Sequence, residues 1–217
     1  QLQKFLPLGD QGQQTFLPLI DTDQLPSWTF LNDSSVKLAP GEGRAVPVTI
    51  RIPKEVAPGG YYEAFFVSSV PAVEGKMPAG FRAGTLFFVS VKGDVKTQLT
   101  VQGFERESPK HVSHLPVNMR LMLQNTGGVH VQPAGFIVVK NFFGRIVERI
   151  PVNQEGKYVL PGSRRTIDVA WEGFSKDLVT DRFWQTVKRQ WRDGYCGWYT
   201  LQPEILYSDV ISKRIEV

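Results

Sequence analysis

Short runs of alternating apolar and polar residues follow one another along most of the chain. In residues 45–52 (AVPVTIRI), Val46, Val48 and Ile50 fall on one face, which is the period of a half-buried β-strand. Pro47 falls on the other face, so we expect this strand to lie at a sheet edge or to carry a bulge. Comparable runs predict further strands at 61–68, 85–91, 95–101, 117–123, 135–140, 145–150, 166–171, 197–208 and 211–217. The pattern therefore predicts an all-β protein.

One segment has helical periodicity instead. In residues 180–192 (TDRFWQTVKRQWR), Trp184, Val187 and Trp191 recur at the spacing of one helix face. A threonine that can cap the first turn begins the segment, and a glycine follows it. We therefore expect one short helix near residues 178–192.

An internal repeat divides the chain into two related halves. Residues 38–48 (LAPGEGRAVPV) match residues 159–169 (VLPGSRRTIDV) in the Pro-Gly pair, an arginine and two alternating apolar positions. The second copy has an insertion before its next strand, and the predicted helix falls within it. The repeat predicts two β-sandwich domains, at 1–103 and 104–217.

The repeat also bears on the first domain's opening strands. The counterpart of the strand near 117–124 would fall largely before residue 1, so we expect these strands to be missing from the first domain. Either the chain has been trimmed or another protein supplies the strand. A sandwich with a vacant strand position exposes unpaired backbone that invites such a donor strand.

Several longer motifs resemble a known group of proteins. The run W-x9-L-x-PGE-x-R-x-V-x-V-x-I-x-IP from Trp28 to Pro53, followed by APGGYYEAFFVSS at 57–69, resembles the first domain of the WxL-interacting protein family and related bacterial cell-surface proteins. Residues 84–95, 124–147, 159–171 and 197–209 are similar to its linker strand and second domain.

The resemblance implies two tandem immunoglobulin-like β-sandwiches displayed outside the cell. It further implies peptidoglycan binding by the first domain and host or partner binding by the second. Parent proteins of this family usually carry a C-terminal membrane anchor. This sequence has none, so anchorage would depend on a longer parent chain.

Composition narrows the function classes. The 41% hydrophobic fraction argues against disorder, and a net charge of +4 is too small for the basic surface of a typical nucleic-acid binder. The single cysteine, Cys196, can form neither an intrachain disulfide nor a cysteine-based zinc site. We expect no cofactor, no metal and no nucleic-acid partner.

The residues that could do chemistry do not form a catalytic set. His111 and His114 lie three apart in the predicted linker with no third ligand nearby, which favours solvated histidines over a metal pair. We expect His130 to be a half-exposed strand residue and Cys196 a buried structural one. The acidic residues are scattered, which disfavours a carbohydrate-active enzyme module. The sequence therefore predicts a protein that is not an enzyme.

The predicted helix is the candidate binding surface. Its basic and aromatic side chains could contact an acidic polymer, a membrane face or another protein. Alternatively, its aromatic stripe packs onto the sandwich and leaves only the basic face in water. The candidate binding residues are Arg182, Trp184, Lys188, Arg189, Trp191 and Arg192.

Two further predictions concern other parts of the chain. Trp28 and Trp171 lie beside the repeated motif, and we expect both in the core. The loop 70–82 is either a binding loop or a plain hairpin connection.

Together these observations predict an extracellular cell-surface protein that binds cell-wall polymer or other surface proteins, with homo- or hetero-assembly left open. The alternative is a pilus-type periplasmic chaperone, or a structural subunit of a surface assembly that uses strand complementation.

Overall fold

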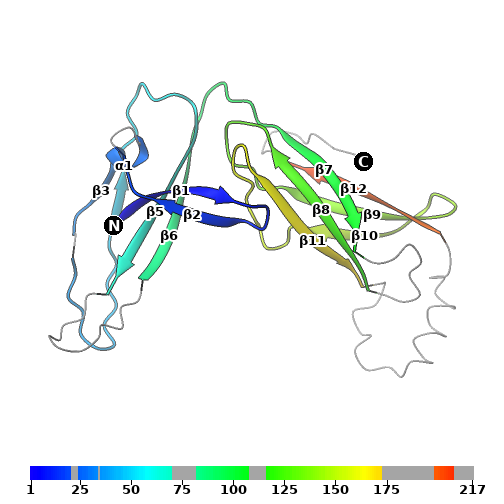
Figure 1. Cartoon of the computed structure of the whole chain (residues 1–217), viewed down its shortest axis with the longest axis horizontal. Coiled ribbons are helices and arrows are strands. Elements are labelled where there is room, and N and C mark those ends of the chain that lie inside the picture. The colour runs from blue at the N-terminus through cyan, green and yellow to red at the C-terminus, as the bar shows by residue number, and fades with distance from the viewer. Residues whose placement is uncertain (21–23, 34, 70–81, 108–115, 173–197, 208–217) are drawn as a thin grey trace. The chain divides into compact units, whose positions relative to one another are not determined.

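The computed structural model describes residues 1–20, 24–33, 35–69, 82–107, 116–172 and 198–207. These residues form twelve strands and one short helix, and the strands pair in antiparallel sheets (Figure 1). The prediction of an all-β protein is confirmed. The chain divides into two compact units, one comprising Gln1–Leu8 and Gln13–Val95, the other Gly9–Gly12 and Lys96–Val217.

The first unit contains a four-stranded sheet and a two-stranded sheet. The larger sheet has the order β2-β1-β5-β6, and the smaller one pairs β3 with β4. A single helical turn, α1, leads into β3. The bounds are β1 Leu2–Leu8, β2 Gln13–Leu17, α1 Gln24–Trp28, β3 Thr29–Leu31, β4 Val48–Ile50, β5 Gly59–Ser68 and β6 Arg82–Val91.

Aromatic rings pack on both faces of the larger sheet. Phe5 is almost fully buried, and its ring centroid lies 6.2 Å from that of Tyr62 and 5.7 Å from that of Phe88. Trp28 packs against Tyr61 with centroids 4.9 Å apart. Because successive side chains of a strand point to opposite faces, Tyr61 and Tyr62 lie on different sides of the sheet.

The second unit is a sandwich of two three-stranded sheets. Their orders are β10-β9-β12 and β11-β8-β7. Alternate residues of β8, among them Met119, Leu121 and Leu123, are buried against residues of the other sheet such as Ile137 and Val139. The bounds are β7 Leu99–Arg106, β8 Val117–Asn125, β9 Ala134–Asn141, β10 Ile146–Val152, β11 Arg164–Trp171 and β12 Tyr199–Leu206.

The two copies of the sequence repeat form the same local turn. In the first copy, the Glu42 amide donates to the Ala39 carbonyl oxygen at 3.0 Å, and in the second the Ser163 amide donates to the Leu160 carbonyl oxygen at 3.1 Å. The glycine inside each turn is left-handed, with φ of 81° in the first copy and 70° in the second. A positive φ favours glycine, which explains why the Pro-Gly pair recurs.

Most strand boundaries differ from the predicted ones by one to three residues, and two strands differ by more. The strand predicted at 45–52 is confined to Val48–Ile50, directly after Pro47, because proline has no amide to donate to a ladder. The strand predicted at 95–101 begins at Leu99 and runs on to Arg106. The elements β1, β2, α1 and β3 were not predicted at all.

Other predictions are confirmed or fall outside the described residues. Trp28 and Trp171 are buried, as expected for core residues, with 7% and 5% of their surface exposed. The loop predicted at 70–82 falls almost entirely outside the described residues, as do the helix near 178–192 and the strand at 211–217.

Candidate binding surfaces

The candidate residues from the predicted helix cannot be placed. All six lie outside the described residues, and so do both linker histidines and the cysteine. These residues are Arg182, Trp184, Lys188, Arg189, Trp191, Arg192, His111, His114 and Cys196. Two other surfaces of the second unit, formed by described residues, are candidates for binding.

His130 is half-buried in the second unit, as predicted, but it lies between β8 and β9 and not in a strand, so that part of the prediction is wrong. Its ring meets the ring of Tyr158 edge to face, with centroids 5.3 Å apart. Burial lowers the pKa of the His130 imidazole, because the charged form is less well solvated there. His130 is therefore neutral at pH 7, packed against an aromatic ring.

The hairpin between β9 and β10 ends in two exposed phenylalanines. Phe142 is 78% exposed and Phe143 is 83% exposed, and their rings meet edge to face with centroids 5.7 Å apart. Asn141 shapes the turn, because its Oδ1 accepts hydrogen bonds from the backbone amides of Phe143 at 3.1 Å and Arg145 at 3.0 Å. Gly144 closes the turn with a φ of 74°. The two rings are thus presented to water on a well-defined turn.

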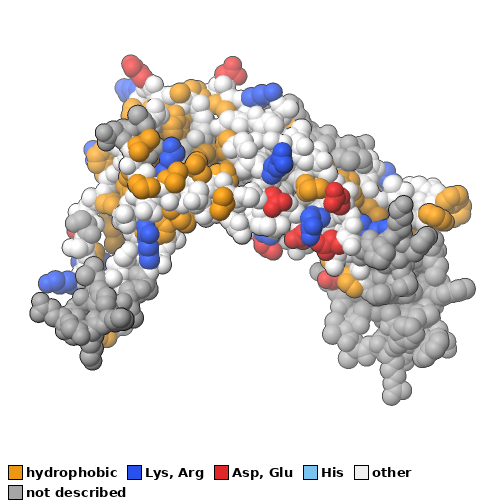
Figure 2. Space-filling view, in the orientation of Figure 1, with side chains coloured by type: hydrophobic (Ala, Val, Ile, Leu, Met, Phe, Trp, Pro, Cys, Tyr) orange, Lys and Arg blue, Asp and Glu red, His pale blue; other side chains and the backbone are white. Residues whose placement is uncertain are grey.

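A third aromatic residue accompanies this turn. Trp198 is 80% exposed and directly precedes β12, whose first residue, Tyr199, pairs with Asn141. We call Phe142, Phe143 and Trp198 the aromatic tip. Figure 2 shows hydrophobic side chains gathered at the end of this hairpin, at the right of the view. Exposed apolar side chains that lie together on a protein surface often mark an interaction site.

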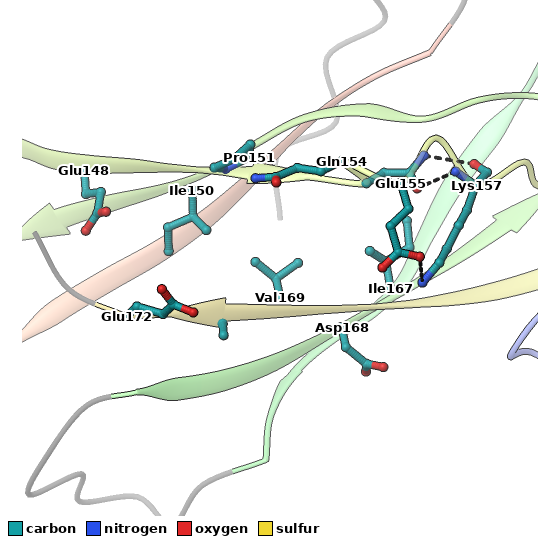
Figure 3. Close-up of a pocket in the computed structure, with 12 residues that line it drawn as sticks. Glu148, Ile150, Pro151, Gln154, Glu155, Lys157, Ile167, Asp168, Val169 and Glu172 are labelled. Carbon is teal, nitrogen blue, oxygen red and sulfur yellow. Dashed lines mark hydrogen bonds and ion pairs between the residues drawn. The ribbon is translucent and has the colours of Figure 1, made fainter. Parts of the chain in front are cut away.

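A second feature of this unit is a cleft of about 540 Å³ between β10 and β11 (Figure 3). These strands are the edges of the two sheets of the sandwich in the described part of the chain. Ile150, Ile167 and Val169 form an apolar floor, and Figure 3 shows Ile150 and Val169 pointing toward each other. We call this the β10–β11 cleft.

The rim of the β10–β11 cleft is predominantly acidic. Glu148 and Glu172 lie at one end, and Glu155 and Lys157 lie at the other, where Lys157 Nζ pairs with Glu155 Oε2 at 3.0 Å (Figure 3). Glu148 Oε2 also accepts a hydrogen bond from Trp171 Nε1 at 2.5 Å, which fixes its position. Three carboxylates face one ammonium group, so the cleft favours a cationic ligand.

A fourth carboxylate belongs to the outer face of β11. Asp168 points away from the cleft in Figure 3, and its Oδ1 lies 3.5 Å from Nε of Arg120 on β8. Arg120 also pairs with Glu107. Asp168 therefore points away from the cleft and shares the guanidinium of Arg120 with Glu107.

The backbone edge of β11 can accept an extended chain. The Thr166 amide donates to the Asp10 carbonyl oxygen at 2.7 Å, and Thr166 Oγ1 donates to Asp10 Oδ2 at 3.0 Å. Asp10 belongs to the second unit by its contacts. Because amides alternate in direction along a strand, those of Asp168 and Ala170 point the same way as that of Thr166, away from β8. Beyond Thr166, this edge is unpaired in the described part of the chain.

Neither surface was predicted from the sequence. The Phe-Phe pair between Asn141 and Gly144 gave a usable signal, since hairpin turns normally carry small or polar residues. No sequence pattern indicates the cleft. Its two walls, β10 and β11, are separated along the chain by a segment that contains a turn and the isolated bridge of Val159.

Within the described ranges, no three His, Cys, Asp or Glu side chains lie together in a way that could hold a metal ion. In those same ranges, no helix has the length and apolar character needed to cross a membrane. No family model, curated protein or solved structure matches this chain.

Proposed function

We propose that this chain is a non-enzymatic binding protein of the cell exterior, with two immunoglobulin-like sandwiches, that captures a partner protein at the β10–β11 cleft. The partner would contribute an extended segment with alternating basic and apolar side chains. One observation carries this proposal: an apolar, acid-rimmed cleft lies beside a strand edge, that of β11, which is unpaired beyond Thr166 among the described residues.

The shape and chemistry of the cleft favour an extended occupant. A strand added to β11 would receive backbone hydrogen bonds from the outward-facing amides of Asp168 and Ala170. Its side chains would alternate, so that apolar ones could reach Ile150 and Val169 while basic ones stay near the rim. The carboxylates of Glu155 and Glu172 would then attract the basic side chains.

The contact between Asp10 and Thr166 supports this mode of binding. It shows that the first part of the β11 edge already accepts a backbone carbonyl from a segment distant in sequence. The unpaired remainder of the edge has the same geometry, which suits strand addition.

The proposed location rests on the resemblance in sequence. The motif from Trp28 to Pro53 and the run at 57–69 resemble bacterial cell-surface proteins. Cell-wall polymer is therefore the competing ligand, and the experiment is designed to separate it from a protein partner.

The direct test is titration with fluorescent ten-residue peptides. One peptide alternates lysine and valine, and its control alternates glutamate and valine. We expect the lysine peptide alone to bind, and the pair Glu155→Lys with Glu172→Lys to weaken its binding about tenfold or more. The matched control is Glu55→Lys with Asp94→Lys, which makes the same change in net charge at exposed positions of the first unit.

Peptidoglycan sedimentation is run alongside. Retention of the chain by peptidoglycan, with no binding of the lysine peptide, would contradict capture of a protein segment and favour the wall polymer. Equal loss of peptide binding in the cleft variant and in the matched control would show a general charge effect, which also contradicts the proposal.

A further inference from the structure

The aromatic tip is separate in position and chemistry from the β10–β11 cleft. Phe142 and Phe143 project beyond the last paired residues of the β9–β10 ladder, on a turn closed by the hydrogen bond from the Asn141 amide to the Arg145 carbonyl oxygen. Both rings and Trp198 are about four-fifths exposed, as their values of 78%, 83% and 80% show. A projecting turn has no concave surface with which to enclose a ligand.

The charges beside the aromatic tip are basic. Lys140 lies at the end of β9 and Arg145 at the start of the return strand, and residues 140–147 contain no acidic residue. Arg145 is exposed, whereas Lys140 is half-buried and donates from Nζ to Gln202 Oε1 at 2.8 Å. The tip thus combines apolar rings with positive charge on one hydrogen-bonded turn.

We propose that the aromatic tip inserts into the interfacial layer of an anionic lipid bilayer. Aromatic side chains favour the boundary between headgroups and acyl chains, and arginine and lysine favour anionic headgroups. A convex apolar turn can enter a deformable layer directly, whereas a protein partner would have to offer a pocket shaped to two adjacent rings. The basic flanks give the charge complementarity that selects an anionic surface.

The tip is also held in a conformation ready for insertion. Asn141 Oδ1 accepts hydrogen bonds from two backbone amides of the turn. The backbone that carries the two phenylalanines is therefore held by these bonds as well as by the contact between the rings. Pre-organisation of this kind reduces the ordering cost of binding.

The test is sedimentation of the whole chain with two kinds of vesicle. One consists of phosphatidylcholine alone, and the other of phosphatidylcholine and phosphatidylglycerol in equal parts. We expect binding to the anionic vesicles, weakened about tenfold or more by Phe142→Ser with Phe143→Ser. Arg145→Glu should weaken it as well, and so should raising salt from about 0.1 M to about 0.5 M.

The matched control is Phe136→Ser, which removes another exposed phenylalanine of β9 away from the turn. It should leave vesicle binding unchanged, and circular dichroism should show that every variant is folded. No vesicle binding by the unmodified chain, or equal binding by the double serine variant, would overturn the proposal. The proposal would also be overturned if size-exclusion chromatography showed that the unmodified chain is a dimer, that the double serine variant is a monomer, and that neither binds vesicles. The lysine-peptide titration tests the β10–β11 cleft, and the vesicle experiment tests the aromatic tip. The failure of one proposal can therefore be distinguished from the failure of the other.

Discussion

The carboxyl oxygen Oε1 of Glu63 lies 2.6 Å from the hydroxyl oxygen Oγ1 of Thr29 inside the first unit. Glu63 has no exposed surface, and its Oε2 has no hydrogen-bond partner. Thr29 Oγ1 also donates to the Leu25 carbonyl oxygen at 3.0 Å. Since a hydroxyl has one proton, Thr29 divides it between the Leu25 carbonyl oxygen and Glu63 Oε1, so the buried carboxyl group of Glu63 is poorly compensated.

This relationship predicts that the first unit loses stability as pH rises. Burial raises the pKa of Glu63 above its ordinary value of 4.5, although the Thr29 contact opposes this. A raised folded-state pKa means that the native state holds the proton more tightly. Its contribution to the free energy of unfolding is therefore full below about pH 4.5 and declines as pH rises toward the folded-state pKa.

Replacement of the carboxyl by a neutral amide should remove this dependence. We expect Glu63→Gln to raise the free energy of unfolding by about 1–2 kcal/mol at neutral pH and to flatten its decline above about pH 4.5. Urea unfolding at several pH values measures both effects. Glu55→Gln, at an exposed position, is the control and should change neither. An unchanged pH slope in Glu63→Gln would show that Glu63 is not the group responsible.

Asn125 is a buried anchor for the turn after β8. Its Nδ2 donates to the carbonyl oxygens of Val129 and Val159, both at 2.8 Å, and its Oδ1 accepts from the Gly127 amide at 2.9 Å. Asn125→Ala would remove the Asn125 partner of the Val129 carbonyl oxygen and of the Gly127 amide, whereas the Val159 carbonyl oxygen would keep the Val131 amide. We expect a loss of about 2–4 kcal/mol in the free energy of unfolding. Asn118→Ala, on the exposed side of the same strand, should cost less than about 1 kcal/mol in the same urea titration.

Gly135 is required by close backbone approach in the β9–β12 pair. Its φ is 144°, and an added Cβ would lie 2.1 Å from the carbonyl oxygen of Glu204. We expect Gly135→Ala to lower the free energy of unfolding by about 2–3 kcal/mol, since both the backbone conformation and the spacing must change. Gly43→Ala is the control, because open space surrounds that position and its φ is not positive. Similar melting temperatures for both variants would contradict this explanation.

Strand periodicity was predictable where one face of the strand is buried. In β8, buried residues alternate with more exposed ones from Val117 to Asn125, and the alternation in sequence follows directly. In β1, only Phe5 is buried, and the apolar residues fall on both faces of a sheet that carries aromatic rings on both sides. The two-residue period is therefore absent there, and β1 was missed.

The candidate surfaces depend on tertiary structure to different degrees. The aromatic tip is local, because Asn141 and Gly144 define the turn that exposes the two phenylalanines between them. The cleft is not local, because Ile150 and Val169 meet only when the two sheets of the sandwich pack. No pattern of residues along the chain specifies such a gap.

Capture of an extended cationic segment is tested most directly by residue-resolved hydrogen exchange with the lysine–valine peptide. The account predicts that the amides of Asp168 and Ala170, which point away from β8, exchange readily in the free chain and become protected when the peptide is bound. The cleft variant Glu155→Lys with Glu172→Lys should show no such protection. Peptide binding without protection of these two amides, or with protection confined to other strands, would contradict strand addition at the β10–β11 cleft.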